Sequence, residues 1–188
     1  AGSPRSGRRA AAAVAQTVRV PGTPVLRPIA DADLPALLAL NAGAVPAVGA
    51  VGPDGLRRLA AMACWAMTTP AADAFLIALA PGAPYGSPNY RWVSARWRRF
   101  AYVDRIVVAP GLRGTGVGRA LYEALFADLA AQGVPRVTCE VNVSPPNPGS
   151  LAFHARLGFR RTGVRSDGPG GTTVAMLVRP LPGGVSPG

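Results

Sequence analysis

A strand, a glycine-rich turn and a helix follow one another between Tyr102 and Leu129, and this stretch constrains the fold most. Residues 102 to 108 are mostly β-branched and apolar, and Ala109-Pro-Gly111 interrupts them. The run Arg113-Gly-Thr-Gly-Val-Gly118 then opens a helix whose apolar residues recur every four positions, at Val117, Leu121, Leu125 and Leu129. Glycine lacks the Cβ atom that would keep an anion from the backbone, and the first N–H groups of a helix have no partner within it. The stretch therefore predicts a phosphate-binding turn.

Two common nucleotide-binding motifs do not fit this turn. A P-loop requires Gly-Lys-Ser or Gly-Lys-Thr, and the chain contains no lysine. A dinucleotide fingerprint requires Gly-x-Gly-x-x-Gly or Ala, but a motif that starts at Gly116 has Leu121 at its third site. A motif that starts at Gly114 places Gly118 one position too early. Another kind of phosphate-bearing ligand is indicated.

The run from Arg113 to Gly118 resembles the Arg/Gln-x-x-Gly-x-Gly/Ala acyl-CoA turn of the GNAT superfamily of N-acetyltransferases. A second block supports this, because Cys139-Glu-Val-Asn142, Asn147 and the run from Ser150 to Phe159 resemble the last conserved block of that superfamily. In both, a strand and an asparagine precede a helix that ends in Gly-Phe. The two motifs have the family's order and spacing, and the resemblance covers roughly residues 25–181.

The resemblance implies a single-domain α/β (α+β) acetyltransferase fold. Its central sheet is mixed and mainly antiparallel, helices flank it, and the strands carrying Ile106 and Val141 splay apart to hold acyl-CoA. We expect a flexible tail at residues 1–24, the domain at 25–181 with an insert at 81–100, and a flexible end at 182–188. We expect strands at 25–29, 65–67, 74–80, 102–108, 136–143, 159–164 and 172–178. We expect two helices capped by Asp31 and Asp54, a third that opens within the run 113–118, and a fourth at 150–157.

Composition excludes several classes of function. The net charge is +11 and every one of the twenty basic residues is arginine, which we interpret as the bias of a GC-rich genome. Apart from residues 91–99, no run interleaves basic and aromatic residues in a recognisable nucleic-acid module, so solvated charge is the better explanation of the net charge. No stretch approaches the roughly 18 apolar residues of a membrane helix, and we expect a cytoplasmic protein. Cys64 and Cys139 lack metal-ligand spacing, so we predict no metal.

The segment at residues 81–100 is unusual for its aromatic residues and arginines. Tyr90, Arg91 and Trp92 could grip an acidic or aromatic substrate through bidentate or cation–π contacts. Alternatively, the segment is a short amphipathic helix that packs Trp92 and Trp97 on the sheet or on a second subunit of a homodimer. The resemblance implies that a segment at this position, just before the cofactor strand, forms part of the acceptor-binding site.

The resemblance also implies acetyl-CoA as co-substrate. We expect the cofactor to contact the strand, the glycine turn and the last helix, through Ile106, Val107, Val108, Arg113, Gly114, Thr115, Gly116, Val117, Gly118, Asn147 and His154. The expected reaction is transfer of the acetyl group to a primary amine, of a small molecule or a peptide, by direct attack in a ternary complex. The alternative is an acyl-CoA-binding regulatory module that is catalytically weak.

Acetylation of an amine requires a base for its proton, donors for the oxyanion, and an acid for the departing thiolate. Glu140 matches a strand glutamate that serves as base in the branch acetylating protein N-termini. Asp104 lies nine residues before Arg113, where other branches carry an acidic residue, and both remain candidates. His154 is the only histidine of the chain and replaces a tyrosine that many members use as the acid. It is either this acid or a polar lining of the cofactor channel.

Overall fold

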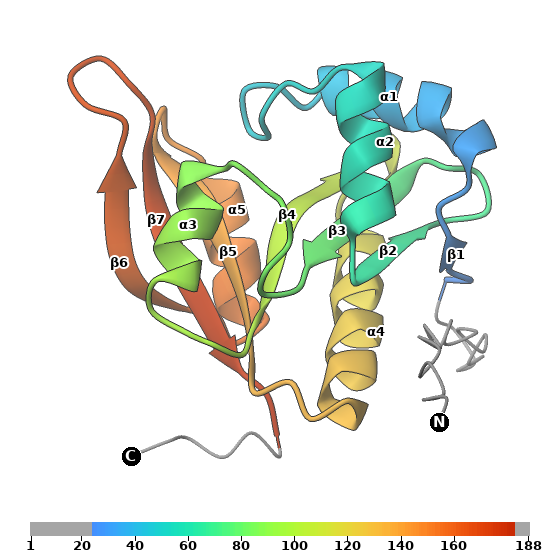
Figure 1. Cartoon of the computed structure of the whole chain (residues 1–188). Helices are drawn as coiled ribbons and strands as arrows, with labels where there is room; N and C mark the ends of the chain where they lie inside the picture. The colour runs from blue at the N-terminus through green and yellow to red at the C-terminus, as the bar shows by residue number, and fades with distance from the viewer. Residues whose placement is uncertain (1–23, 183–188) are drawn as a thin grey trace, which may run out of the picture.

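A computed structural model of the chain describes residues 24–182 (Figure 1). The predicted tails at 1–24 and 182–188 lie almost wholly outside these residues. The strands are β1 (Arg27–Pro28), β2 (Trp65–Thr68), β3 (Ala74–Leu79), β4 (Ala101–Val108), β5 (Arg136–Ser144), β6 (Arg160–Ser166) and β7 (Thr173–Pro180). The α-helices are α1 (Leu34–Ala42), α2 (Pro53–Met62), α3 (Pro88–Ser94), α4 (Val117–Ala131) and α5 (Pro148–Arg156), and short 3₁₀ helices span Asp31–Asp33 and Pro110–Leu112.

The strands form one seven-stranded sheet in the order β1-β2-β3-β4-β5-β7-β6. Every neighbouring pair is antiparallel except β4 and β5, which are parallel. The prediction of a mixed and mainly antiparallel sheet is therefore confirmed. Each helix in the described part of the chain is too short or too polar to cross a membrane.

The parallel strands β4 and β5 separate soon after they begin. Their backbones are paired only at Ala101 with Val137 and at Tyr102 with Thr138, whereas β5 pairs with β7 along most of its length. Beyond Tyr102, the β5-facing edge of β4 consequently has no strand partner. This divergence confirms the predicted splay and leaves backbone donors and acceptors available at the centre of the sheet.

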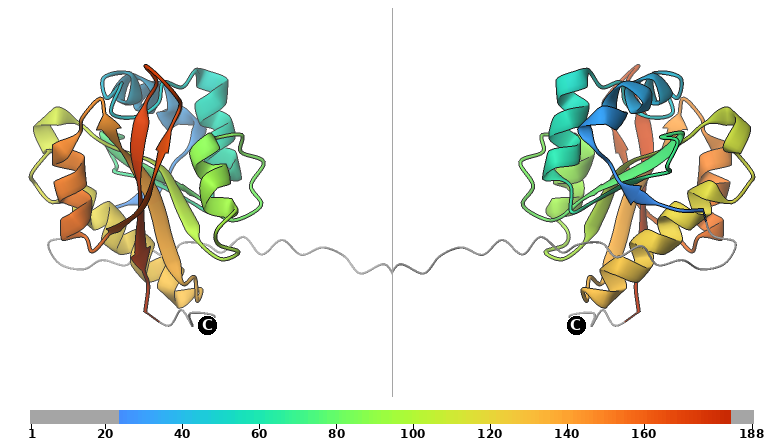
Figure 2. Two further views of the ribbon diagram at one scale, coloured as in Figure 1. Left: turned by 90° about the vertical axis from the view of Figure 1, so that its left-hand side faces the viewer. Right: turned by 90° about the vertical axis from the view of Figure 1, so that its right-hand side faces the viewer.

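Helices cover both faces of the sheet (Figure 2). Helices α4 and α5 lie on one face, and α1, α2 and α3 lie on the other. The apolar period of α4 buries Leu121, Leu125 and Leu129 against the sheet, as its spacing predicts. Strand β3 lies between the two layers, so all six of its residues are buried. Two hydrophobic cores, one on each face of the sheet, thus hold β4 and the glycine turn in place.

The first two helices start differently from the sequence prediction. Asp31 begins a 3₁₀ turn, and it is Asp33 whose carboxylate accepts the N–H of Ala30 at 2.8 Å. Asp54 lies inside the first turn of α2, because Pro53 occupies the first helical position and Gly52 caps it. The predicted caps at Asp31 and Asp54 are therefore wrong.

Candidate active site

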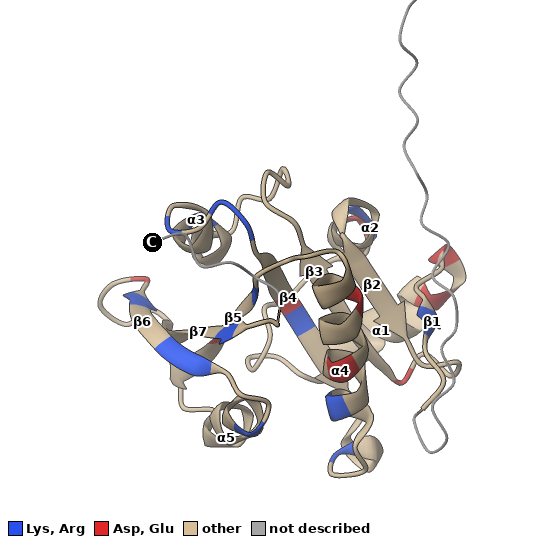
Figure 3. Ribbon diagram, turned by 90° about the horizontal axis from the view of Figure 1, so that it is seen from below, with Lys and Arg blue, Asp and Glu red and all other residues tan. Residues whose placement is uncertain are grey.

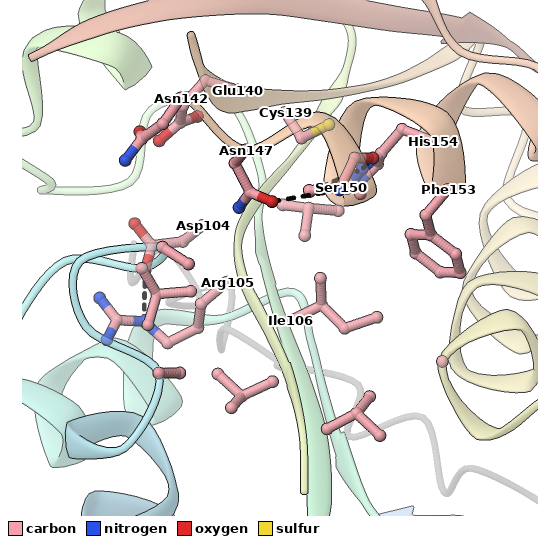
Figure 4. Close-up of a pocket in the computed structure, with 18 of the residues that line it drawn as sticks. Asp104, Arg105, Ile106, Cys139, Glu140, Asn142, Asn147, Ser150, Phe153 and His154 are labelled. Atoms are coloured by element: carbon pink, nitrogen blue, oxygen red, sulfur yellow. Dashed lines mark hydrogen bonds and ion pairs between the residues drawn. The ribbon is translucent and has the colours of Figure 1, made fainter. Parts of the chain in front are cut away.

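A cavity of about 840 Å³ opens where β4 and β5 diverge. It gathers most of the residues predicted for the site, namely Asp104, Ile106, Val107, Val108, Arg113, Gly114, Gly116, Gly118, Glu140, Asn147 and His154. In the close-up, Asp104 on β4 and Glu140 on β5 project into the same space, and Asn147 and His154 enter from α5 (Figure 4). Residues from three separate stretches of the sequence therefore share one cavity.

The glycine turn forms the end of the cavity next to helix α4. Gly114 and Gly116 adopt positive φ angles of +83° and +94°, and a Cβ atom built on either meets nothing within 4 Å. Gly116 caps α4, so the first N–H groups of that helix face open space beside the backbone. Arg113 and Arg119 line the same part, and because Arg119 is paired with Glu123 at 2.6 Å, the added positive charge comes mainly from Arg113. The turn thus fits an anionic group such as a pyrophosphate.

The side chains of Thr115 and Val117 do not line the cavity. The hydroxyl of Thr115 donates to the carbonyl of Leu112 at 2.7 Å, and Val117 packs against the core beneath α4. Their side chains therefore shape the turn, and only their backbone faces remain for a cofactor.

Glu140 has one engaged and one unengaged carboxylate oxygen. Its Oε1 accepts hydrogen bonds from the hydroxyl of Tyr102 and from Nδ2 of Asn89, both at 2.9 Å. Its Oε2 is buried and has no hydrogen-bond partner among the described residues. Burial, together with the negative charge of Asp104, raises the pKa of Glu140 to about 7, against the two hydrogen bonds, which lower it. Near neutral pH this carboxylate can both take up and release a proton.

Asp104 has both carboxylate oxygens engaged. The hydroxyl of Tyr85 donates to Oδ1 at 2.5 Å, and Nε of Arg105 donates to Oδ2 at 2.7 Å. The side chain is only 4% exposed, and Arg105 is anchored in turn by Oδ1 of Asn41 at 2.7 Å. Asp104 thus has no oxygen without a hydrogen-bond partner to meet an amine, whereas Glu140 has one. The geometry favours Glu140 over Asp104 as the base.

His154 lies on the cavity wall with both ring nitrogens engaged. Nδ1 lies 2.8 Å from the carbonyl oxygen of Ser150, and Nε2 lies 2.8 Å from the hydroxyl of Tyr122. The carbonyl can only accept, so Nδ1 carries the proton and Nε2 accepts from Tyr122. Burial lowers the pKa of His154, which is 3% exposed, and keeps the ring neutral. The geometry therefore favours a channel-lining, hydrogen-bonding role over the predicted role as acid.

Replacing His154 with phenylalanine is expected to lower the free energy of unfolding by about 1–3 kcal/mol, because the buried hydroxyl of Tyr122 then loses its acceptor. Urea denaturation measures the change. The double variant Tyr122→Phe, His154→Phe removes both partners and should recover part of the loss. Equal losses in the single and double variants would show that the hydroxyl left without an acceptor is not the cause of the loss.

The segment before β4 does form a wall of the cavity, but through other residues than predicted. Tyr90 is 4% exposed, and its hydroxyl donates to the carbonyl of Ala80 at 2.7 Å. Trp92 packs against Gly163 of β6, and neither it nor Arg91 lines the cavity. The cavity therefore gives no support to substrate contact by Tyr90, Arg91 and Trp92, which stays a prediction. The lining residues of this segment are Tyr85, Ser87 and Asn89.

Several polar residues of the site were not foreseen. Asn89 and Tyr102 hold Glu140 from positions 51 and 38 residues away in the sequence, and Arg165 of β6 bonds to Asn89 from 76 residues away. No local pattern marks them, since each is an isolated polar residue whose neighbours depend on the sheet. Asn147 was foreseen, and its Oδ1 accepts the N–H of Ser150 at 3.2 Å and so caps α5.

Comparison with known proteins identifies the family. The model described as "Acetyltransferase (GNAT) family" matches residues 54–159, and the chain belongs to this family. The chain is 43% identical over 59 residues to a phosphinothricin N-acetyltransferase of Streptomyces coelicolor, a match that covers 31% of this chain and 33% of that protein. It is 38% identical over 60 residues to an L-2,4-diaminobutyric acid acetyltransferase of Nocardia farcinica, which covers 32% and 30%. The matches thus span about a third of the length of these relatives.

Solved structures share the fold over nearly their whole length. A phosphinothricin acetyltransferase from Sinorhizobium meliloti, in complex with AcCoA, has a TM-score of 0.65 at 20% identity, and the match covers 88% of this chain and 94% of that one. A ribosomal-protein-alanine N-acetyltransferase from Brucella melitensis has a TM-score of 0.60 at 20% identity, over 83% and 97%. At this level of identity the likeness shows the acetyltransferase fold.

Proposed function

We propose that the chain is an N-acetyltransferase that transfers an acetyl group from acetyl-CoA to a primary amine. The observation that carries the proposal is the pairing, in one cavity, of an open glycine turn with a carboxylate that has one unengaged oxygen. Membership of the acetyltransferase family supports it. A purely regulatory binding module would need the turn but not the carboxylate.

Acetyl-CoA would lie along β4, with its pyrophosphate at the glycine turn and its pantetheine arm beside the strand. The N-terminus of α4 with Gly114 and Gly116 would hold the pyrophosphate, with Arg113 and Arg119 beside it. The unpaired edge of β4 beyond Tyr102 would bond the amide groups of the pantetheine arm, as an added strand does. The thioester would then lie between the strands, near Glu140.

The reaction is direct attack in a ternary complex. The amine nitrogen bonds to the thioester carbonyl carbon, Oε2 of Glu140 takes the proton that the nitrogen loses, and the carbon–sulfur bond breaks with its electrons on sulfur. The protonated Glu140 gives up its proton, directly or through water, to the thiolate. The products are the acetylated amine and CoA, and the carboxylate is restored. Asn89 and Tyr102 keep Oε1 occupied, so Oε2 is the oxygen that takes up the proton, directly or through water.

The acid side of the pH profile should report Glu140. Its pKa of about 7 means that the carboxylate is mostly protonated below this pH and cannot accept a proton, so kcat/KM should rise tenfold per pH unit up to about pH 7 and then level off. Deprotonation of the amine substrate adds a second limb to the pH profile, and the position of that limb shifts with the pKa of the amine. A limb near pH 7 that stays in place across such amines identifies the enzyme group. Its absence would contradict the assignment.

A screen of amines tests the function itself. Free amino acids, peptides, polyamines and aminoglycosides are each incubated with acetyl-CoA, and release of the CoA thiol and the mass of the product are followed. Acetylation of at least one class above the background of hydrolysis is the expected result. If the protein binds CoA by calorimetry but releases no thiol with any amine, the regulatory module is the better description.

A further inference from the structure

A chain of polar contacts runs from Glu140 to the hairpin between β6 and β7. Nδ2 of Asn89 donates to Oε1 of Glu140 at 2.9 Å, and Oδ1 of the same amide accepts from Nε of Arg165. Nη1 of Arg165 then donates to Oδ1 of Asp167 at 2.7 Å. Only one amide group therefore separates a guanidinium from the carboxylate that we assign as the base. This spacing is within reach of a single small molecule.

Among the arginines that line the cavity, Arg165 is the one placed to bind an acceptor. Arg113 and Arg119 flank the glycine turn, and Arg156 lies exposed at the C-terminal end of α5. Arg105 is buried and held by Asp104 and Asn41. Arg165 comes from β6, a strand that carries several basic residues (Figure 3). Its side chain is 17% exposed, and its Nη2 makes no hydrogen bond to any residue between 24 and 182. It keeps a donor for an incoming anion.

The contact with Asp167 shows that this guanidinium accommodates a carboxylate. Asp167 lies in the hairpin turn with 44% of its side chain exposed, and Arg165 holds the pKa of its carboxyl below the usual range. An ion pair on such an exposed residue is weak, because water and salt screen it. A carboxylate of a substrate can replace Asp167 at the guanidinium without large cost.

We infer that Arg165 binds an anionic group of the acceptor, so that the acceptor is an amine carrying a carboxylate a few bonds from its nitrogen, such as a free amino acid. The inference rests on the proposed function. The carboxylate lies at Arg165, the amine lies at Oε2 of Glu140, and Asn89 joins the two binding points. Arginine suits this role because its planar fork matches a carboxylate.

The test compares free amino acids with their carboxamides, which keep the amine and lose the charge. Wild type should favour the free acid by about 10- to 100-fold in kcat/KM, the range that hydrogen bonds to a charged partner supply. In Arg165→Gln this preference should collapse, mainly through a higher KM for the acid, and Arg165→Lys should restore part of it. Arg161→Gln is the matched control, since Arg161 lies exposed on the same strand and does not line the cavity.

A second variant makes the opposite prediction. Asp167→Asn removes the internal competitor for Arg165 and should lower KM for free amino acids, with less effect on the amides. The inference is overturned if wild type acetylates amides, peptides or polyamines as well as free acids. It is also overturned if Arg165→Gln lowers the rates with acid and amide equally, which is the mark of a structural role. Failure to acetylate any amine would instead overturn the proposed function.

Discussion

Replacing Glu140 with glutamine is expected to lower kcat by roughly 10²–10⁴-fold, the usual contribution of a general base. The amide retains an oxygen for Tyr102 and Asn89, so the local hydrogen bonds survive while the proton acceptor is lost. Affinity for CoA should change little, because the glycine turn is untouched. Steady-state kinetics and calorimetry on the same preparation measure both quantities.

The pH dependence of thermal stability shows whether Glu140→Gln is slow because it is unfolded or because it has lost the base. The folded-state pKa of Glu140 is about 7 against an ordinary value of 4.5, so its contribution to stability is full below 4.5 and is lost as the pH rises through about 7. The glutamine variant has no such titration, and relative to wild type it should gain stability over this range, which thermal unfolding at about pH 5 and pH 8 would show. A variant that is as stable as wild type but slow has lost the base.

Asp104→Asn serves as the comparison for the base assignment. This change leaves Arg105 without its charged partner, so its stability must be measured alongside its rate. If the folded Asp104→Asn protein loses far more activity than Glu140→Gln, the role of base belongs to Asp104.

Replacing Gly116 with valine is expected to weaken acetyl-CoA binding by about 100-fold or more. Its side chain would enter the open space beside the N-terminus of α4, where the pyrophosphate would lie, and the φ of +94° strains a β-branched residue. Hydrogen bonds to a charged group each contribute about 1.5–3 kcal/mol, so losing one or two accounts for this factor. Calorimetric titration with acetyl-CoA measures the effect.

Gly168→Val is the control for strain. Gly168 also has a positive φ, of +103°, and its Cβ would meet nothing within 4 Å, but it lies in the hairpin turn and does not line the cavity. Both variants should lose a similar amount of stability, and only Gly116→Val should lose CoA affinity. Unchanged affinity in a folded Gly116→Val protein would contradict the placement of the pyrophosphate.

The features that sequence alone predicted are those encoded over a few neighbouring residues. The glycines of the turn, the four-residue apolar spacing of α4 and the short helix α5 that ends before Gly158 each depend on contacts within one or two turns of chain. Such contacts depend only on local backbone geometry, so they produce a recognisable pattern in the sequence. The mainly antiparallel sheet and the splay of β4 from β5 followed from the family resemblance that these local motifs carry.

Only the tertiary structure decided which polar side chains meet in the site. Asn89 and Tyr90 are adjacent in the sequence, yet one lines the cavity and the other is buried, because α3 is too short for its apolar period to show which face is covered. The choice between Glu140 and Asp104 likewise depends on Tyr85 and Arg105, whose contacts with Asp104 leave it no free oxygen. A pKa is set by burial and by charges brought close across the sheet, and these distances do not exist until the chain has folded.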